Sequence, residues 1–311
     1  MNSNSHPALS AFVEGIQPDE SLPWSLDRPP VVLTIASSDP SGGAGIQADL
    51  KTFAALGAYG ASVITTVTVQ NTLGVTHVHH LPVKIVRDQL RAVIHDFDIR
   101  AIKIGAIGDF EVVKVLEEEL KHFIFPIVLD PIHRSTNGAS LANGREFRTF
   151  FSGLLYIADL ITPNIPEAEE WTGIEIDSIG AMEYAAERLI EFGASNVLLK
   201  GGHLEGPEIV DILVTREETY HFRTPRIESK NLHGTGCTLS SAIVAALGYD
   251  FPLLHAVQIA KEYVTGAIEF AKEREIGAGI GPLDHEWIAR RGLMSLAKKT
   301  NVIQKQKVIH E

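Results

Sequence analysis

Short apolar runs alternate with amphipathic stretches along most of the chain. Continuous, β-branched runs such as 31–36 and 127–129 are typical of strands covered on both faces of a sheet. Segments 83–97 and 179–192 instead carry apolar residues at helical spacing. Because the two patterns alternate from about residue 31 onward, they predict one α/β domain: a mostly parallel central sheet with helices on both faces.

The individual elements can be placed from these runs and from their capping residues. The expected strands are 31–36, 61–69, 101–106, 127–131, 160–164 and 196–203, followed by two short strands at 209–214 and 219–223. The expected helices begin near 46, after Asp109 and with Glu167, span 83–97 and 179–192, start again at Ser240 and Leu253, and end with 284–296. Right-handed crossovers would gather the loops that follow the strands at one edge of the sheet, where open α/β sheets bind ligands.

The two ends of the chain lack either pattern. Residues 1–28 are polar and punctuated by proline, so we expect an arm or tail outside the core. Residues 297–311 are rich in lysine and glutamine and are expected to form a solvated tail. No internal repeat or linker divides the intervening residues 29–296, which we expect to form a single domain.

Composition and charge narrow the classes of function. The formal net charge of −12 argues against nonspecific nucleic-acid binding, which needs a basic surface. No apolar run approaches the length of a membrane span, and the N-terminus has no features of a signal peptide. The single cysteine cannot form an intrachain disulfide and fits a reducing compartment. We therefore expect a cytoplasmic protein that handles small molecules, without nucleic-acid or membrane partners.

The stretch His233-Gly234-Thr235-Gly236-Cys237 interrupts the pattern just before an apolar helix. Glycines let the backbone bend sharply, and N–H groups at a helix start lack intrahelical partners, so the stretch favours anion binding. Cys237 would lie where the positive helix end lowers the pKa of a thiol. These residues alone leave two interpretations open: a site that moves a phosphoryl group, or a tight turn before a core helix with an inert cysteine.

Polar residues follow several predicted strands, and each has a structural and a functional interpretation. Asp130, Asn164 and Glu167 offer the hard oxygen ligands that Mg²⁺ prefers, although each is also a normal capping residue. Lys200 could face a nucleotide phosphate or lie at a strand edge, and His203 could contact a ligand or be structural. The loop 37–45 is glycine-rich but matches neither the dinucleotide fingerprint nor the P-loop.

Several of these motifs together resemble those of the hydroxymethylpyrimidine and phosphomethylpyrimidine kinases of thiamin biosynthesis, within the ribokinase-like superfamily. The resemblance runs from about Val31 to about Trp287 and keeps the motifs in the same order, which is far more specific than any one motif. The residues that carry it are 39–53 (DPSGGAGIQADLKTF), Gln70-Asn71-Thr72, Lys103-Ile104-Gly105, Thr162-Pro163-Asn164 with Glu167-Ala168, Lys200-Gly201-Gly202-His203 and His233-Gly234-Thr235-Gly236-Cys237-Thr238.

The resemblance implies a ribokinase-like three-layer fold, a homodimer, and a kinase that uses ATP and Mg²⁺. Its substrate would be 4-amino-5-hydroxymethyl-2-methylpyrimidine and then the monophosphate, giving the diphosphate. Cys237 would stand where related sugar kinases carry an aspartate base, and the amides of Gly234, Thr235 and Gly236 would hold the transferring phosphate. By the same resemblance, the substrate side would include Gln70, Ser37, Asp39, Ala44, Ala106 and Ile132, the nucleotide side Lys200, Thr238 and Asn164, and the metal side Asp130 and Glu167. Open sheet edges and the strands near 209–223 would be candidate dimer surfaces.

Three positions depart from the family pattern. Ser37 stands where many members carry glycine, Ala106 stands where methionine is common, and 132–138 differs from the usual segment after Asp130-Pro131. His133 and Arg134 in that segment could bind a phosphate already on the substrate. The departures concern the identity of the substrate, so a pyridoxal or pyridoxine kinase of the same subfamily stays open. The N-terminal arm also keeps open a non-catalytic pyrimidine sensor, although the intact stretch 234–237 with Asp130 and Glu167 argues against it. Gln70 favours the aminopyrimidine, because an amide both donates and accepts hydrogen bonds along a ring edge.

Overall fold

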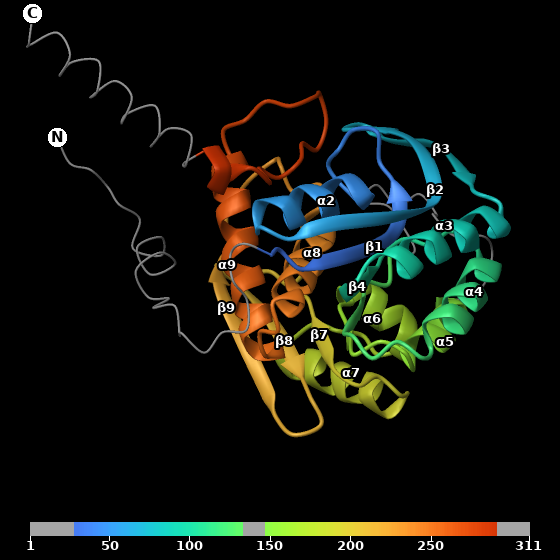
Figure 1. The fold of residues 1–311 in the computed structure, drawn as a ribbon. Helices are drawn as coiled ribbons and strands as arrows, with labels where there is room; N and C mark the ends of the chain where they lie inside the picture. Colours follow the sequence, from blue (N-terminus) through green and yellow to red (C-terminus); the bar gives the residue numbers. More distant parts are fainter. Residues whose placement is uncertain (1–27, 133–146, 291–311) are drawn as a thin grey trace, which may run out of the picture.

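The computed structural model describes residues 28–132 and 147–290 (Figure 1). The predicted C-terminal tail and, apart from Arg28, the predicted N-terminal arm lie outside these ranges, so the division into arm, domain and tail stays a prediction. His133 and Arg134, and the end of the last predicted helical segment, also lie outside them. Within the described ranges, no helix is long and apolar enough to cross a membrane.

The described residues form one nine-stranded sheet in the order β3-β2-β1-β4-β5-β6-β7-β8-β9. Its six central strands, β2, β1 and β4–β7, run parallel, whereas β3 at one edge and β8 and β9 at the other pair antiparallel. The strands are β1 Val31–Ser38, β2 Tyr59–Asn71, β3 Gly74–His80, β4 Ile99–Ile104, β5 Ile127–Leu129, β6 Leu160–Ile161, β7 Val197–Leu199, β8 Glu208–Val214 and β9 Thr219–Pro225.

Helices cover both faces of this sheet, which gives three layers (Figure 1). One face carries α2 (Gly45–Ala55), α8 (Thr235–Gly248) and α9 (Leu253–Ala271). The other carries α3 (Val83–Asp96), α4 (Phe110–Leu120), α5 (Phe147–Leu155), α6 (Ile165–Thr172) and α7 (Ile179–Glu191). The predicted ribokinase-like α/β class is therefore confirmed.

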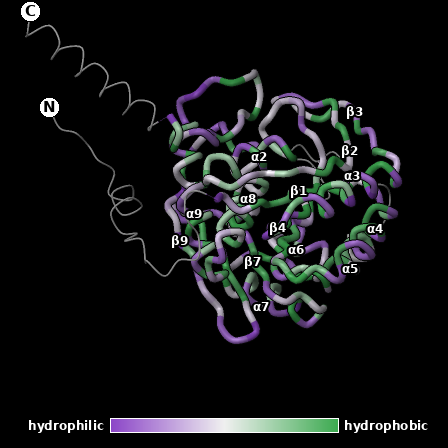
Figure 2. Tube along the Cα trace, viewed as in Figure 1, coloured by the Kyte–Doolittle hydropathy of each residue, from purple (hydrophilic) through white to green (hydrophobic). Residues whose placement is uncertain are grey.

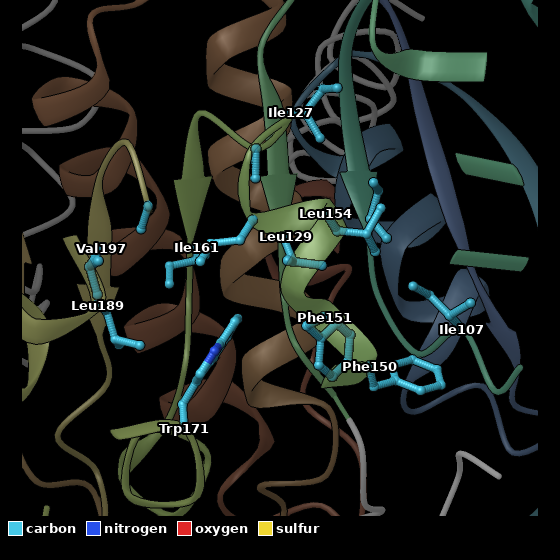
Figure 3. Packing of buried hydrophobic residues seen from close by; sticks show 14 of the residues in the cluster. Ile107, Ile127, Leu129, Phe150, Phe151, Leu154, Ile161, Trp171, Leu189 and Val197 are labelled. Atoms are coloured by element: carbon cyan, nitrogen blue, oxygen red, sulfur yellow. The ribbon is translucent and has the colours of Figure 1, made fainter. Parts of the chain in front are cut away.

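Alternating side chains of the central strands point to opposite faces of the sheet and belong to two separate hydrophobic cores. In β1, Val32 packs in the core under α8 and α9, whereas Leu33 belongs to the core under the opposite helices. Figure 2 shows hydrophobic residues concentrated along the inner strands and hydrophilic residues along the outer loops. In the core under α3–α7, Phe151 of α5 lies between Phe150 and Trp171, with ring centroids 4.9 and 6.0 Å away (Figure 3). Burial on both faces explains why the central strands are continuous apolar runs.

Four elements differ from the expectation. The second strand is longer than predicted and continues through Gln70 into an antiparallel hairpin with β3, so Gln70 lies inside the strand rather than past its end. Neither β3 nor α5 was predicted. Helix α8 begins at Thr235, five residues before the expected Ser240, because Gly234 takes the left-handed conformation at its N-cap. Cys237 consequently lies in the first turn of this helix.

Candidate active site

A cavity of about 420 Å³ opens at the carboxyl edge of the parallel strands, facing the N-terminus of α8. Most residues that the sequence singled out line it, including those from segments far apart in the chain. They are Ser37, Asp39, Ala44, Gln70, Ala106, Asp130, Ile132, Asn164, Glu167, Lys200, Gly234, Thr235, Gly236 and Cys237. The topology explains this gathering, because parallel strands end at the same edge of the sheet. Proximity does not assign roles, and the individual roles stay predictions.

The backbone at the start of α8 is shaped so that an anion can approach it. Gly234 has a φ of 86°, and a Cβ built on it would lie 1.8 Å from the Gly43 carbonyl oxygen, so only glycine fits. The first i→i−4 bond of the helix runs from the Thr238 N–H to the Gly234 carbonyl. The amides of Gly236 and Cys237 precede that bond and lie at the positive end of the helix. This arrangement is the one expected for binding a phosphate.

Asp39 organises the glycine-rich loop rather than presenting a free carboxylate. Its two oxygens accept hydrogen bonds from the Ser41 amide and hydroxyl and from the Gly43 and Ala44 amides. Nε2 of His233 lies 3.1 Å from Oδ2. Burial opposes ionisation, but the hydrogen bonds from His233 and Ser41 hold the Asp39 pKa below its ordinary value. Asp39 lines the cavity, and its direct contact with a substrate stays a prediction.

Gln70 lies at one end of the cavity and is held by neighbours on both sides. Its amide nitrogen is 3.0 Å from Nε2 of His233, and its amide oxygen is 3.2 Å from the Thr68 hydroxyl. His233 thus joins Gln70 to Asp39 and, through the chain, to the loop that precedes α8. The amide of Gln70 keeps donor and acceptor capacity for a polar ring edge in the cavity.

An ion pair between Asp130 and Lys200 lies next to the start of α8. Lys200 Nζ is 2.8 Å from Oδ1 of Asp130, which is fully buried and also accepts from Thr162 and Ser240. Burial disfavours the charge of Asp130, but Lys200 and Lys103 keep its pKa below the ordinary value. The absence of a side chain at Gly236 keeps this space open, since a Cβ there would lie 3.2 Å from Lys200 Nζ. Lys200 therefore stands beside the bare backbone where an anion would bind.

Asn164 and Glu167 form the capping box of α6, so part of their predicted role is structural. The Asn164 side chain accepts from the Glu167 amide at 2.9 Å, and Oε2 of Glu167 accepts from the Asn164 amide at 2.8 Å. Burial raises the Glu167 pKa to about 7, against the opposing effect of Lys200. The second carboxylate oxygen has no part in the capping box and is the one available to a ligand.

The pKa of the Cys237 thiol differs from the value expected from the sequence. The helix end was predicted to lower its pKa, but the thiol is 7 % exposed and burial raises its pKa to about 11. Lys103 and a backbone hydrogen bond from Gly45 act in the opposite direction without overcoming burial. Desolvation is the larger effect here because the sulfur lies among packed backbone and buried carboxylates. In the free protein Cys237 is consequently a protonated thiol at neutral pH.

A second cavity of about 360 Å³ adjoins the first across the start of α8. Both cavities are lined by Asn164, Lys200, His203, Leu232, Thr235 and Gly236. Apolar side chains form much of the rest of the second cavity: Ile209, Ile227, Leu239, Val264 and Ile268. Thr238 lies apart from both, since its buried hydroxyl donates to the Gly234 carbonyl and contacts His285. Its predicted contact with a nucleotide is not supported by this position.

Two residues of the site were not predicted from the sequence. His233 was noticed only as part of its motif, because a single histidine next to glycines carries no sign of the Asp39 and Gln70 contacts. Lys103 appeared in a motif but within a strand, and the structure places it fully buried at the floor of the first cavity. A charged residue inside an otherwise apolar strand run was the available signal.

Two adjoining cavities, an anion-binding helix start between them and a ribokinase-like sheet define a class of enzyme: a small-molecule kinase. The chain belongs to the phosphomethylpyrimidine kinase family, whose family model matches residues 39–284. The hydroxymethylpyrimidine/phosphomethylpyrimidine kinase of Streptomyces coelicolor is 43 % identical over 259 residues, which cover 83 % of this chain and 95 % of that protein.

Other similar proteins include larger enzymes and solved structures. The thiamine biosynthetic bifunctional enzyme of Arabidopsis thaliana is 44 % identical over 265 residues, and the match spans 84 % of this chain but 51 % of that protein. The crystal structure of phosphomethylpyrimidine kinase from Clostridium difficile has a TM-score of 0.68 and 44 % identity, covering 76 % of this chain and 99 % of that one. An ADP complex of Bacillus subtilis pyridoxal kinase has a TM-score of 0.76 and 30 % identity, covering 84 % and 99 %.

Proposed function

We propose that this protein transfers the γ-phosphoryl group of ATP to 4-amino-5-hydroxymethyl-2-methylpyrimidine, and then phosphorylates the monophosphate to the diphosphate for thiamin biosynthesis. The observation that carries the proposal is the single cavity that joins Gln70 to the helix start at Gly236 and Cys237. A ring held by Gln70 places its hydroxymethyl arm toward that helix start. The relatives with this activity and the family membership support the same reaction.

The second cavity is the proposed site for the nucleotide. Its apolar wall suits the faces of a purine, and a nucleotide bound there would extend its terminal phosphate toward Lys200 and Gly236, which line both cavities. Phosphoryl transfer is catalysed mainly by positioning and by stabilising charge. The helix start and Lys200 supply that charge in this chain.

Mg²⁺ fits the donors present if it is held mostly by phosphates and water. Among the described residues, no group of three or more acidic, histidine or cysteine side chains is arranged to hold a metal. Mg²⁺ commonly binds proteins through one or two carboxylates together with substrate phosphates, so Asp130 and Glu167 would hold it from one side. When bound, the ion neutralises negative charge on the phosphates.

Cys237 is the proposed acceptor of the hydroxyl proton. The hydroxymethyl oxygen attacks the γ-phosphorus as the bond to the ADP oxygen breaks, and the proton leaves for the sulfur. Because the thiol is protonated in the free protein at neutral pH, it must first give its own proton to solvent, and only the thiolate accepts the proton of the hydroxymethyl group. The transition state is loose, so the hydroxyl proton can leave late.

The choice between an aminopyrimidine and a pyridine substrate tests Gln70. In Gln70→Ala, we expect the KM for hydroxymethylpyrimidine to rise about tenfold or more, as for the loss of a ring-edge hydrogen-bond pair, with the KM for ATP within about twofold. The measurement is ADP release with hydroxymethylpyrimidine, pyridoxal and pyridoxine in turn.

Asn71→Ala is the matched control, since its side chain hydrogen-bonds the Leu73 amide in the exposed turn. Faster ADP release with the pyridines than with the pyrimidine in the unmodified protein would favour the pyridoxal kinase alternative. Stabilisation by the pyrimidine without ATP consumption would instead favour a sensor.

We also propose a homodimer that uses the β2–β3 edge, whereas the cytoplasmic location stays a prediction from composition. Val67 and Val69, on one face of β2, are 40 % and 55 % exposed, and Leu73 in the turn is 67 % exposed. We expect sedimentation to give the mass of two chains and Val69→Lys to give the mass of one. Tyr184→Lys, an equally exposed position on α7, is the control. A monomeric unmodified chain at micromolar concentration would contradict the proposal.

A further inference from the structure

A fully buried ion pair lies directly beneath the start of α8, and the mechanism proposed above does not use it. Lys103 of β4 and Asp49 of α2 are both 0 % exposed, and Lys103 Nζ is 2.5 Å from Oδ1 of Asp49. Lys103 Nζ also lies 3.4 Å from the carbonyl oxygen of Cys237. A buried ion pair is costly in desolvation compared with apolar residues, so its presence beside the backbone of Cys237 calls for a reason.

The carboxylate of this pair is held more firmly than the ammonium group. Asp49 accepts from the Thr34 hydroxyl at 2.6 Å and from the Ser241 hydroxyl at 2.7 Å, in addition to Lys103. These partners come from β1 and α8, so the carboxylate is fixed from three sides. Lys103 has the Cys237 carbonyl as a weaker second acceptor, and its side chain reaches the floor of the substrate cavity. The positive charge is therefore directed toward the first turn of α8.

We propose that Lys103 and Asp49 are a positioning pair that sets how readily the Cys237 thiol ionises. Lys103 is the cation that stabilises the thiolate, and Asp49 limits that effect by neutralising Lys103. The inference rests on the proposed function for its meaning, because a base at Cys237 is needed only in a kinase. Its physical content, a charge acting on one sulfur, is independent of any substrate.

Four charged side chains from the surrounding elements act on Cys237 through space. Lys103 favours the thiolate, whereas Asp49 and Asp130 oppose it. Lys200, paired with Asp130, interacts with the same sulfur. Among them, the Lys103–Asp49 pair has no role in holding a phosphate or a metal in the proposed mechanism. Changing this pair therefore alters the electrostatic potential at the sulfur without removing a ligand-binding group.

If the pair acts electrostatically on the thiol, removing the cation and removing the anion should have opposite effects on its ionisation. A purely structural role does not predict opposite effects. Lys103→Met keeps a straight, buried side chain but removes the cation, so the thiol should ionise less readily. Asp49→Asn keeps the shape but leaves Lys103 without its neutralising partner, so the thiol should ionise more readily. If the pair only stabilised the fold, both substitutions would loosen the packing around Cys237. Alkylation of the sulfur would then become faster in both variants.

The test uses the fact that Cys237 is the only cysteine of the chain. Its alkylation by iodoacetamide, followed by intact mass at a pH below the thiol pKa, proceeds at a rate proportional to the thiolate fraction. We expect alkylation about tenfold slower in Lys103→Met and about tenfold faster in Asp49→Asn, as for an opposite charge added or removed nearby. Thr34→Val, which removes a neutral hydrogen bond to Asp49, should stay within about twofold.

Two controls keep the outcome decisive. Alkylation rates in guanidinium must be equal for all variants, and thermal unfolding must show a folded protein at the assay temperature. Faster alkylation in both charged variants, or no change in either, would overturn the inference. If Lys103→Met does not fold, the pH dependence of alkylation in Asp49→Asn decides alone: a lower thiol pKa than in the unmodified protein supports the pair, and an unchanged thiol pKa contradicts it, whatever the rate. Because no substrate is present, this result stands whether or not the chain proves to be a pyrimidine kinase.

Discussion

In Cys237→Ala, we expect kcat for the hydroxymethylpyrimidine to fall by about 10²- to 10⁴-fold, the usual contribution of a positioned acid or base. The KM for ATP should change by less than about threefold, because the side chain lies in the substrate cavity and not among the residues of the second cavity. The measurement is steady-state kinetics of ADP release with each substrate varied. Near-normal kcat in this variant would remove Cys237 from the mechanism.

The pH dependence of kcat/KM is a second test of Cys237 as the acceptor of the hydroxyl proton. Burial raises the Cys237 pKa to about 11, so in the free protein the thiolate fraction grows as the pH rises. If Cys237 takes the proton, kcat/KM should increase with pH through the neutral and mildly alkaline range. In Cys237→Asp, a carboxylate with a much lower ordinary pKa should move the rise to lower pH and leave a plateau at neutral pH. Identical profiles for the two proteins would contradict the assignment, and Cys237→Ser provides the matched neutral control.

Asp130→Asn should cause a comparably large loss, with kcat/KM for MgATP lower by about 10²-fold or more. The substitution keeps the shape of the side chain but removes a buried charge that pairs with Lys200 at 2.8 Å. Lys200 then has no fixed position beside the phosphate site, and Mg²⁺ loses one of its two proposed carboxylates. The measurement is MgATP kinetics at several Mg²⁺ concentrations, where the variant should also need more Mg²⁺.

Asp159→Asn is the control for that variant. Asp159 precedes β6 at the opposite, amino-terminal end of the parallel strands, where its carboxylate accepts from the Ile127 amide at 2.8 Å, and it lines neither cavity. Burial raises its pKa, so losing its charge costs little. We expect near-normal kinetics for Asp159→Asn. Equal losses in the two variants would show that the Asp130 effect reflects a general disturbance of the sheet rather than the phosphate site.

The fold could be predicted from the sequence because each central strand is buried on both faces. A run such as 31–36 then becomes continuously apolar, and its alternation with helical periodicity defines the α/β class. The hairpin strand β3 was missed because its exposed edge carries His77 and His79 and has no such run. The start of α8 was placed too late because the left-handed conformation of Gly234 is a tertiary feature, fixed by contact with Gly43.

The residues that line the cavity could largely be predicted from the sequence, but their pKa values and hydrogen-bond partners could not. Motif order brought Gln70, Asp130 and Cys237 together correctly in one cavity. The thiol pKa was predicted in the wrong direction, because helix position is visible in a sequence whereas desolvation by distant segments is not. Likewise, the sequence gives no sign of the hydrogen bonds that Asp39 accepts within its loop, or of its contact with His233.

The mass of the product formed from Mg-ATP and hydroxymethylpyrimidine tests the central claim most directly. The account predicts a species heavier by one phosphate, followed by a species heavier by two, and neither from Cys237→Ala on the same time scale. Recovery of unchanged hydroxymethylpyrimidine, with ATP intact and a folded protein in the tube, would contradict it.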